Sequence, residues 1–400
     1  MHILMIAPEP FFEPRGTPFS EYHRIRALLA LGHTVDLVTY PFGHDVEMPG
    51  LRVFRCLRPP LIRSVGIGPS MAKVPLDVSL ALSSLRRALG GRYDAVHSHE
   101  EGVAIGLVLS AALGIPHLYD MHSSLPQQLS NFKFSQSRML RRLFEVLERM
   151  AVRRSKVVIV ICAELERLVR EIEPAASPVL IENAPGAGDL ADAGGRDAVR
   201  AEFGFTAATP VVLYTGTFEA YQGLDLLFDA MARVAAARPD ARLLLAGGRS
   251  DQVAAARKDI EARGLAGSVV FAGERPAAEI PRFLDAADVL VSPRSRGTNT
   301  PLKIYQYLRA GRAIVATRLL THTQVLDDHV AILTEPTPDG FAAGIVKALA
   351  EPAFAAALGA RAGALAETKY SYEAYLGRTR EAVNRLSAAA SPAAVPGSAA

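Results

Sequence analysis

The chain has 400 residues, of which 50% are hydrophobic, so it holds enough apolar material for two or three domains. Its 44 Lys and Arg against 41 Asp and Glu leave a net charge of +3, which argues against a protein whose main partner is a nucleic acid. Two cysteines, Cys56 and Cys162, cannot form a disulfide framework and do not cluster as in structural zinc sites, so a reducing cytoplasm is the expected location.

The N-terminal segment 2–7 is apolar but runs into Pro8 and Pro10, without a basic region or a cleavage site. We therefore expect a buried first strand rather than a signal peptide. No segment is expected to span a bilayer, which requires about 20 consecutive apolar residues.

From Met1 to about Asn183, short apolar runs alternate with amphipathic stretches. The expected strands cover residues 2–7, 34–40, 52–56, 94–98, 117–121, 157–162 and 178–181. The expected helices between them include 19–31, 70–89, 102–113, 137–154 and 163–171. This alternation predicts βαβ units and a parallel sheet, and runs such as 157–161, apolar on both faces, indicate a sheet covered by helices on both sides.

Residues 184–210 interrupt the pattern and are expected to form a linker with one short helix near 196–203. A second alternation then begins. Its expected strands are 211–214, 242–246, 269–272, 288–291, 313–316 and 330–333, and its expected helices are 223–237, 251–263, 277–286, 301–309 and 338–350. A last helix near 372–386 follows a second domain that already looks complete.

The sequence thus predicts an α/β fold with two Rossmann-like, doubly wound parallel-sheet domains facing across a cleft. We expect residues 1–190 to form the first domain and 191–365 the second. Residues 366–387 are the C-terminal helix, and the Ala-, Ser- and Pro-rich tail 388–400 is expected to be disordered. Chemistry is expected in the turns that follow the strands, at the carboxyl edge of each sheet.

The nucleotide-binding fingerprints of two large classes are absent. No strand is followed by G-x-G-x-x-G, and no G-x-x-x-x-G-K-[ST] occurs, which counts against a dehydrogenase and a P-loop ATPase. The turn after the first strand instead carries Gly16 and Thr17 just before a helix, where a glycine lets backbone N–H groups approach a phosphate or sugar. An ordinary loop glycine is the alternative.

Two expected strand ends carry histidines. His97 and His99 precede Glu100, an arrangement that could bind a metal but lacks a supporting second pair, so substrate contact or packing is favoured. Asp120 and His122 end the next apolar run. His122 could donate to a sugar hydroxyl or exchange a proton with a substrate, or it could simply bond to its neighbours.

The segment 292–317 predicts an anion site. Asn299 or Thr300 is expected to cap a helix whose first residue is Pro301, with Gly311 closing it. The N–H groups of that helix start, with Arg294, Arg296 and Lys303, would make a diphosphate cradle. A structural turn is the alternative. The turn at Gly216 and Thr217, before Gln222, and the pair Gly247–Gly248 offer similar backbone access in the second domain.

The stretch Arg138–Lys156 belongs to an amphipathic helix that is rich in basic residues. Those between 133 and 156 are Lys133, Arg138, Arg141, Arg142, Arg149, Arg153, Arg154 and Lys156, against Glu145 and Glu148. The helix could lie on an anionic membrane, at its inner, cytoplasmic face. A solvated basic face on a core helix explains the pattern equally well.

Taken in order, these features resemble the family-4 retaining glycosyltransferases of the GT-B fold, from Met1 to about Leu386. The features are the loop glycine at Gly16, the strand ends 97–99 and 120–122, Ile181–Asn183, the Gly216 turn, Leu243–Gly248, and the stretches 286–293 and 307–317. The resemblance implies transfer of a sugar from a nucleotide sugar, UDP- or GDP-linked, to an acceptor. It also implies retention at the anomeric carbon, no essential metal, an acceptor-binding first domain, a donor-binding second domain and a terminal helix that returns to the first domain.

Residue by residue, His122 matches the family's active-site His, and Gly16 matches the glycine near the donor phosphate. Thr217 and Gln222 stand where the family has Arg and Lys, and Thr298 and Gln306 stand where it has two Glu. Gln306 could still hydrogen-bond ribose, whereas Thr298 cannot supply a carboxylate. We expect Lys303, with Arg294 or Arg296, to replace the missing cations.

Two rival functions remain open at this point. One is a nucleotide-sugar epimerase on the same plan, which would turn over donor without an acceptor. The other is a degenerate, non-catalytic protein that binds a sugar nucleotide or a partner enzyme, as the loss of both Glu and both cations suggests.

Overall fold

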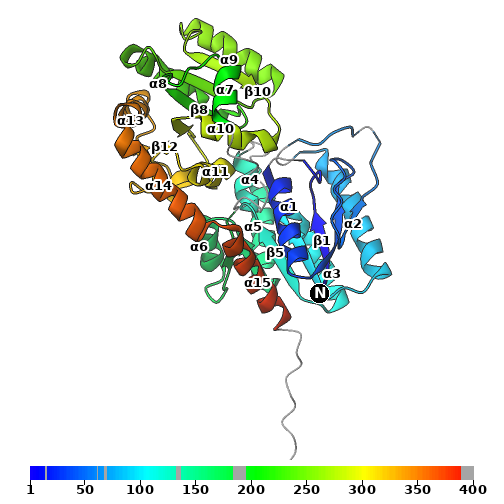
Figure 1. Ribbon diagram of the computed structural model, residues 1–400. Helices are drawn as coiled ribbons and strands as arrows, with labels where there is room; N and C mark the ends of the chain where they lie inside the picture. Colours follow the sequence, from blue (N-terminus) through cyan, green and yellow to red (C-terminus); the bar gives the residue numbers. More distant parts are fainter. Residues whose placement is uncertain (14–15, 61, 67–69, 132–136, 183–194, 389–400) are drawn as a thin grey trace, which may run out of the picture. The chain divides into compact units, whose positions relative to one another are not determined.

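The computed structural model describes residues 1–13, 16–60, 62–66, 70–131, 137–182 and 195–388. The chain divides into two compact units, one formed by Met1–Asn183 with Tyr375–Ala400 and the other by Ala184–Ala374 (Figure 1). Each unit contains one parallel sheet with helices packed on it, which confirms the predicted pair of doubly wound α/β sheets.

The first unit is built on a seven-stranded sheet of order β3-β2-β1-β4-β5-β6-β7. The strands are β1 (His2–Ala7), β2 (Thr34–Thr39), β3 (Leu51–Arg55), β4 (Ala95–His99), β5 (His117–Met121), β6 (Val157–Val160) and β7 (Val179–Leu180). Every pairing is parallel, and the strand order reverses between β1 and β4. The carboxyl ends of β1 and β4 are therefore the topological switch point of this sheet.

Helices cover both faces of this sheet. They are α1 (Gly16–Ala30), α2 (Lys73–Gly90), α3 (Val103–Leu113), α4 (Leu125–Asn131), α5 (Arg138–Arg154), α6 (Ala163–Ile172) and α15 (Tyr372–Ser387), with the 3-10 turn η1 (Glu100–Gly102). Leu4 and Ile6 of β1 join one core with α2 and α3. Ile3 and Met5 point to the opposite face and join α1 and Val383 of α15. Alternate side chains are thus buried on both sides, as a covered parallel sheet requires.

The second unit contains a six-stranded parallel sheet of order β10-β9-β8-β11-β12-β13. Its strands are β8 (Val211–Thr215), β9 (Arg242–Ala246), β10 (Val269–Gly273), β11 (Val289–Ser292), β12 (Ala313–Thr317) and β13 (Ile332–Thr334). Its helices are α7 (Arg196–Glu202), α8 (Leu224–Ala237), α9 (Ser250–Ala262), α10 (Ile280–Ala286), α11 (Leu302–Ala310), α12 (Leu320–Thr323), α13 (Pro338–Ala350) and α14 (Pro352–Lys369), with turns η2 (Ala220–Gln222) and η3 (Ala277–Glu279). The strand order reverses between β8 and β11.

In the part of the chain that the structure describes, three helices were not expected from the sequence: α4, α12 and α14. The longest, α14, packs on α11 and β12 and buries small residues, among them Ala355, Gly359 and Ala362. A Cβ on Gly359 would overlap the carbonyl oxygen of Gly311, so a glycine is required for this close approach. Small residues give a weak apolar period, which explains why the pattern did not predict the helix.

Parts of three predictions fall outside the described residues: Lys133 of the basic stretch, the linker segment 183–194 and the tail residues 389–400. Both cysteines are buried, and among the described residues they form no disulfide bond. Within the described ranges, no single helix combines the length and apolar character needed to cross a bilayer, although one bent pair, Pro338–Ala350 with Pro352–Ser387, reaches that threshold when taken together.

Candidate active site

Two loops meet at the switch point of the second unit, one after β8 and one after β11. The backbone N–H of Ser295 donates to the carbonyl of Tyr221 over 3.1 Å. Gly223 has φ +76°, and a Cβ there would overlap the carbonyl oxygen of Pro293. Gly216, directly after β8, has φ +128°. These positive φ values strongly favour glycine and bring the two loops close together.

Lys303, in the first turn of α11, is buried beside this junction. Its Nζ lies 3.7 Å from the ring centre of Tyr214, and a Cβ on Gly216 would lie 3.3 Å from the same Nζ. The Nζ has no hydrogen-bond partner among the described residues. Burial, and then the charge of Arg294, hold the pKa of Lys303 well below its ordinary value. The second unit therefore holds a buried amine without a counter-charge next to a glycine turn.

Arg294 supports the loop instead of standing free in it. Its Nε donates to the carbonyl of Arg296 over 2.9 Å, its Nη1 donates to the carbonyl of Asn299 over 3.2 Å, and its guanidinium lies over the ring of Tyr221. Burial lowers its pKa. The side chain of Arg296, by contrast, is exposed. The structure thus brings Arg294 near Lys303 and leaves Arg296 on the surface.

The predicted cap of α11 is wrong by one or two residues. The N-cap is Pro301, with no side-chain cap, and the helix begins at Leu302. The carbonyls before it are held by other partners: Thr321 Oγ1 donates to Asn299 over 2.7 Å, and Gln324 Nε2 donates to Thr298 over 2.6 Å. These bonds anchor the segment in an irregular conformation. Thr300 Oγ1 is buried without a hydrogen-bond partner among the described residues and caps nothing.

A histidine that the sequence did not single out links β11 to β12. His322 Nε2 lies 2.8 Å from Ser292 Oγ, and its Nδ1 lies 2.8 Å from the carbonyl and 3.1 Å from the Oγ1 of Thr317. Burial lowers its pKa to about 4, so the imidazole is neutral at pH 7. Thr317 Oγ1 in turn donates to the carbonyl of Arg294 over 2.7 Å. This network fixes the loop that carries Arg294.

The other predicted donor-site residues take different positions. Thr217 is exposed, and its carbonyl accepts from Tyr214 Oη over 2.6 Å. Gln222 is buried in η2, and its Oε1 has no partner in the part of the chain that the structure describes. Gln306 is half-buried on α11, one turn after Lys303. Of the three, only Gln306 is on the same helix as Lys303.

In the first unit, His122 belongs to a buried cluster at the carboxyl ends of β4 and β5. Asp120 accepts from Arg24 Nε over 2.9 Å and lies 3.3 Å from His122 Nε2. His99 Nδ1 lies 3.1 Å from His122 Nε2, and the rings of His97 and His99 are stacked. Although burial opposes ionisation, Arg24 above all keeps the pKa of Asp120 well below its ordinary value. The cluster therefore contains a buried carboxylate–guanidinium pair.

His122 is neutral in this environment. Burial lowers its pKa to about 4, against the opposing effect of Asp120. A neutral imidazole carries one N–H donor and one acceptor, and which nitrogen holds the proton depends on its neighbours. His122 can thus exchange hydrogen bonds with a hydroxyl group, while proton exchange near pH 7 is disfavoured.

The histidines that suggested metal binding do have a third neighbour, but it is not Glu100. Ligand atoms of His97, His99 and Asp120 lie within 4.8 Å of one another, with Asp120 Oδ2 already bonded to Arg24. Glu100 instead accepts from Gln128 Nε2 over 2.8 Å and from Ser123 Oγ over 3.0 Å. The guanidinium leaves this group a poor site for a divalent cation, because it would repel the ion.

Gly16 and Thr17 lie at the start of α1, the helix that follows β1. Gly16 begins α1 with φ +56° and is exposed, and a Cβ there would meet nothing within 4 Å. The Thr17 side chain hydrogen-bonds to Glu9. Thr17 therefore contacts a carboxyl group in this structure, which was not anticipated for a phosphate-binding residue.

Sequence reasoning missed Glu21 and Arg24, both fully buried on α1. They are three residues apart and share a face with Ile25 and Leu28, which are also buried. A charged pair on the apolar stripe of a helix is the signal that could have identified them, because such residues are seldom buried without a partner.

Known proteins resemble the chain in sequence. The model "Glycosyl transferase 4-like domain" matches residues 22–184, and the model "Glycosyl transferases group 1" matches residues 209–351. D-inositol 3-phosphate glycosyltransferase of Segniliparus rotundus is 27% identical over 71% of this chain and 64% of its own length. The match thus spans less than two thirds of that relative. Phosphatidyl-myo-inositol mannosyltransferase of Mycolicibacterium smegmatis is 26% identical over 90% of this chain and 88% of its own length.

Solved structures share the fold at lower identity. Sucrose-phosphate synthase from Thermosynechococcus elongatus has a TM-score of 0.78 at 22% identity, covering 97% of this chain and 100% of that one. Anabaena Alr3699/HepE in complex with UDP-glucose has a TM-score of 0.73 at 18% identity, with coverage of 97% and 100%. Together with the two matched domain models and the two doubly wound sheets, these likenesses place the chain among the glycosyltransferases of the GT-B fold.

Proposed function

We propose that the chain transfers a sugar from a UDP- or GDP-sugar to an acceptor with retention of anomeric configuration, and that the second unit holds the donor diphosphate. The solved Alr3699/HepE complex contains UDP-glucose, which supports a nucleotide-sugar donor. Lys303 carries the proposal: its buried Nζ lies beside the Gly216 turn without a hydrogen-bond partner among the described residues. A diphosphate oxygen would supply the missing counter-charge.

The start of α11 supplies the second part of the proposed site. The backbone N–H groups of Leu302 and Lys303 lie in the first turn, where α-helical N–H groups have no partner within the helix. Such groups, with the positive end of the helix dipole, stabilise an anion. In sugar transfer the leaving diphosphate gains negative charge, so preorganised donors and a cation lower the barrier more than an acid–base pair would. We assign no covalent nucleophile.

The remaining predicted residues take supporting parts in this proposal. Arg294 shapes the loop and adds positive charge near Lys303, and Gln306 hydrogen-bonds the ribose. Gly216 admits the phosphate because it has no side chain. His122 contacts the donor sugar in this proposal, as the resemblance implies, and it does so through a neutral imidazole. No metal ion is assigned a part.

The experiment measures UDP and GDP binding by calorimetry to the wild-type chain, to Lys303→Ala and to Lys347→Ala. Lys347 is a matched control because its Nζ also lies over an aromatic ring in the second unit, that of Phe354, but on an exposed residue. We expect Lys303→Ala to weaken binding at least about 30-fold, as loss of a buried charge partner does. Lys347→Ala should bind normally. Equal affinity of all three proteins contradicts the proposed site.

A second readout follows from the low pKa of Lys303. If the amine is neutral before binding and charged against the diphosphate afterwards, nucleotide binding takes up a proton. The binding enthalpy should then differ between buffers of different ionisation enthalpy, and this difference should disappear in Lys303→Ala. Affinity should also fall as the pH rises, because the proton becomes harder to acquire.

Product analysis separates transfer from its rivals. A donor sugar labelled at the anomeric carbon should appear on the acceptor with unchanged configuration by NMR. Conversion of the donor without an acceptor would favour an epimerase. Nucleotide binding without turnover across a broad acceptor panel would favour a degenerate binding protein.

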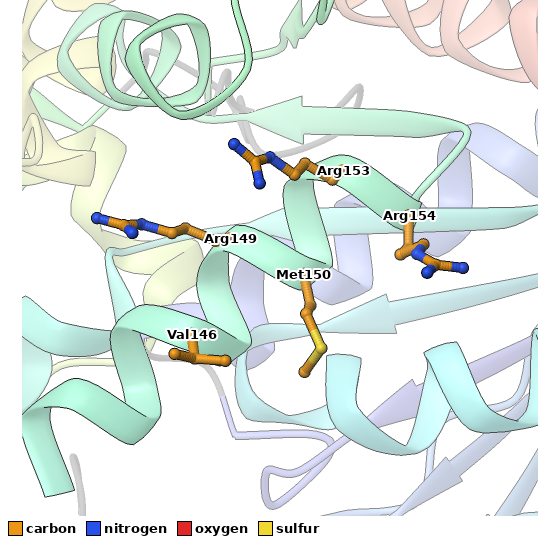
Figure 2. Close-up of a pocket in the computed structure, with 5 residues that line it drawn as sticks. All are labelled: Val146, Arg149, Met150, Arg153 and Arg154. Carbon is orange, nitrogen blue, oxygen red and sulfur yellow. The ribbon is translucent and has the colours of Figure 1, made fainter. Parts of the chain in front are cut away.

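We also propose that α5 rests on an anionic membrane at its inner, cytoplasmic face. Met139 and Leu143 are 83% and 61% exposed on this helix, and Val146 and Met150 are also exposed. Val146 and Met150 line a groove of about 310 Å³ with Arg149, Arg153 and Arg154 (Figure 2). Apolar side chains flanked by guanidinium groups fit an interface where phosphate headgroups lie above acyl chains.

Neighbouring helices also expose apolar side chains. α5 packs beside α3, and α3 packs beside α2. On α2 the exposed apolar residues recur at helical spacing and are Val74, Val78, Leu82, Leu85 and Leu89.

Sedimentation with vesicles that contain anionic lipid tests the membrane contact. Replacing Arg149, Arg153 and Arg154 together with Ala should release the protein from the vesicles. Replacing Arg167 and Arg170, which are exposed on α6, with Ala should leave vesicle binding unchanged.

A further inference from the structure

We propose that the carboxyl edge of the first unit binds an acceptor that carries positively charged amines, such as an amino sugar or an aminocyclitol. The inference rests on the proposed function, because it takes the first unit as the acceptor-binding one. It goes further by naming the charge of the acceptor.

Four glutamates gather at the switch point of the first sheet. Glu9 follows β1, Glu100 and Glu101 follow β4, and Glu21 lies on α1. Their charges act on one another: the pKa of Glu21 is raised well above its ordinary value, first by burial and then by Glu9, Asp120, Glu100 and Glu101. These acids lie outside the carboxyl ends of β1 and β4, where open α/β sheets bind their ligands.

Glu21 is the acid that most directly indicates a ligand. It is 0% exposed, and neither of its carboxyl oxygens has a hydrogen-bond partner among the described residues. His99 Nδ1 lies 3.9 Å from Glu21 Oε1. A buried carboxyl group without partners destabilises a fold unless a bound group satisfies it.

The cations already present do not balance these acids. Lys73 Nζ lies 2.5 Å from Glu101 Oε1. Arg24 pairs with Asp120. Glu100 has neutral partners, Ser123 and Gln128. Lys73 also acts on Glu9 and Glu100, but burial is the first cause and raises the pKa of both. The effects that set the pKa of Glu21 all raise it. A bound cation would compensate all three.

An ammonium-bearing molecule fits this arrangement better than a metal ion. Among the described residues, the group whose ligand atoms all lie within 4.8 Å of one another is His97, His99 and Asp120. The glutamates are not in it, so they are too widely spaced for three of them to bind one ion. A cyclic molecule with several amines can place separate N–H donors against separated carboxylates, and each ammonium offers three donors. Neutral sugar hydroxyls supply no charge.

The test compares charged probes with neutral ones. Calorimetry should detect binding of 2-deoxystreptamine and glucosamine, with inositol and N-acetylglucosamine at least about 10-fold weaker, the size of one charge-assisted hydrogen bond. The carboxyl groups should release protons as they ionise against the amines, so the measured enthalpy should depend on the buffer. Equal binding of charged and neutral probes overturns the inference. So does binding of Mg²⁺ or Mn²⁺ at this edge with no response to amines.

Two substitutions locate the site. Glu21→Gln and Glu100→Gln keep the shape of the protonated acids, so both proteins should fold with a normal circular dichroism spectrum. Each should weaken amine binding about 10-fold or more, whereas Glu47→Gln, an exposed acid of the same unit, should not. UDP and GDP binding, measured in parallel, should be unchanged in all three. If the wild-type protein binds neither UDP nor GDP, the proposed function is contradicted. If amine binding is unchanged in both Glu21→Gln and Glu100→Gln, the inference alone is contradicted.

Discussion

The two units share one fold plan and differ in the charges buried at the carboxyl edges of their sheets. In the first unit, Glu9, Glu21, Glu100 and Asp120 crowd that edge. In the second, the corresponding edge holds Lys303 and Arg294, and the effects that set the pKa of Lys303 are burial and Arg294, with no carboxylate among them. A doubly wound sheet therefore fixes where a ligand binds, while the side chains in the turns decide the charge that it must carry.

The largest effect should come from removing a charge that has a partner. Asp120→Asn leaves the guanidinium of Arg24 buried without its carboxylate, so the free energy of unfolding of the first unit should fall by about 3–5 kcal/mol. Urea unfolding measures this loss. Asp45→Asn removes an ion pair whose acid is 92% exposed, and it should cost at most about 1 kcal/mol. Equal losses would mean that the buried pair is no more stabilising than the exposed one.

At acidic pH, protonation of His322 in the unfolded state should lower the free energy of unfolding of the second unit. Its pKa is about 4 in the folded protein and near 6.5 when unfolded, so the unfolded state alone binds a proton between these values. Stability contributed by the neutral imidazole is complete above pH 6.5 and is lost as the pH falls towards 4, by up to about 3 kcal/mol. NMR titration should show the imidazole still mostly neutral at pH 5. In His322→Asn this part of the acid dependence should be absent.

In the first unit, the contribution of Glu9 to the free energy of unfolding should fall as the pH rises, which is the opposite of the effect of His322. The pKa of Glu9 is raised to about 8, first by burial, so between pH 4.5 and 8 the folded state holds a proton that the unfolded state has lost. Its contribution therefore declines as the pH rises through that range. Glu9→Gln should flatten the decline in urea midpoints measured from pH 6 to 8. An unchanged slope would show that Glu9 is ionised in the folded protein.

Gly216→Ala tests the space beside Lys303. At φ +128° an alanine is strained, at a cost of about 1–3 kcal/mol, and its Cβ would lie 3.3 Å from Lys303 Nζ. Gly264→Ala is the matched control, since its φ is +70° and a Cβ there would meet nothing within 4 Å. Both variants should lose stability, but only Gly216→Ala should also lose nucleotide affinity. Equal nucleotide affinity in the two would place the donor away from this turn.

The smallest expected change in stability comes from a variant that separates the part of Lys303 in nucleotide binding from any part in folding. Lys303→Met replaces a buried amine without a hydrogen-bond partner by an apolar chain of similar length, so the ligand-free second unit should become more stable by about 1 kcal/mol. Nucleotide binding should nevertheless be lost. A fall in stability in urea unfolding would instead indicate that Lys303 has a structural part.

Strand positions followed from the sequence because a covered parallel strand is apolar on both faces, whatever its neighbours are. The alternation identified the thirteen strands of the described residues to within about two residues at either end. Helix α14 was missed because alanine and glycine pack by close approach, which leaves little hydrophobic contrast along the chain. The cap of α11 was placed wrongly because Thr321 and Gln324, distant in sequence, hold the carbonyls before it.

The sequence by itself determined the two α/β repeats, the glycine turn at Gly216 and the basic helix α5, and it led us to propose Lys303 and His122 as site residues. Periodicity and local turn chemistry are properties of neighbouring residues, so they can be identified along the chain. Only the tertiary structure brought Arg24 to Asp120, joined Glu21 to the acids after β1 and β4, and left Lys303 without a carboxylate. Those outcomes depend on which distant charges share a buried space, because burial magnifies every interaction between them.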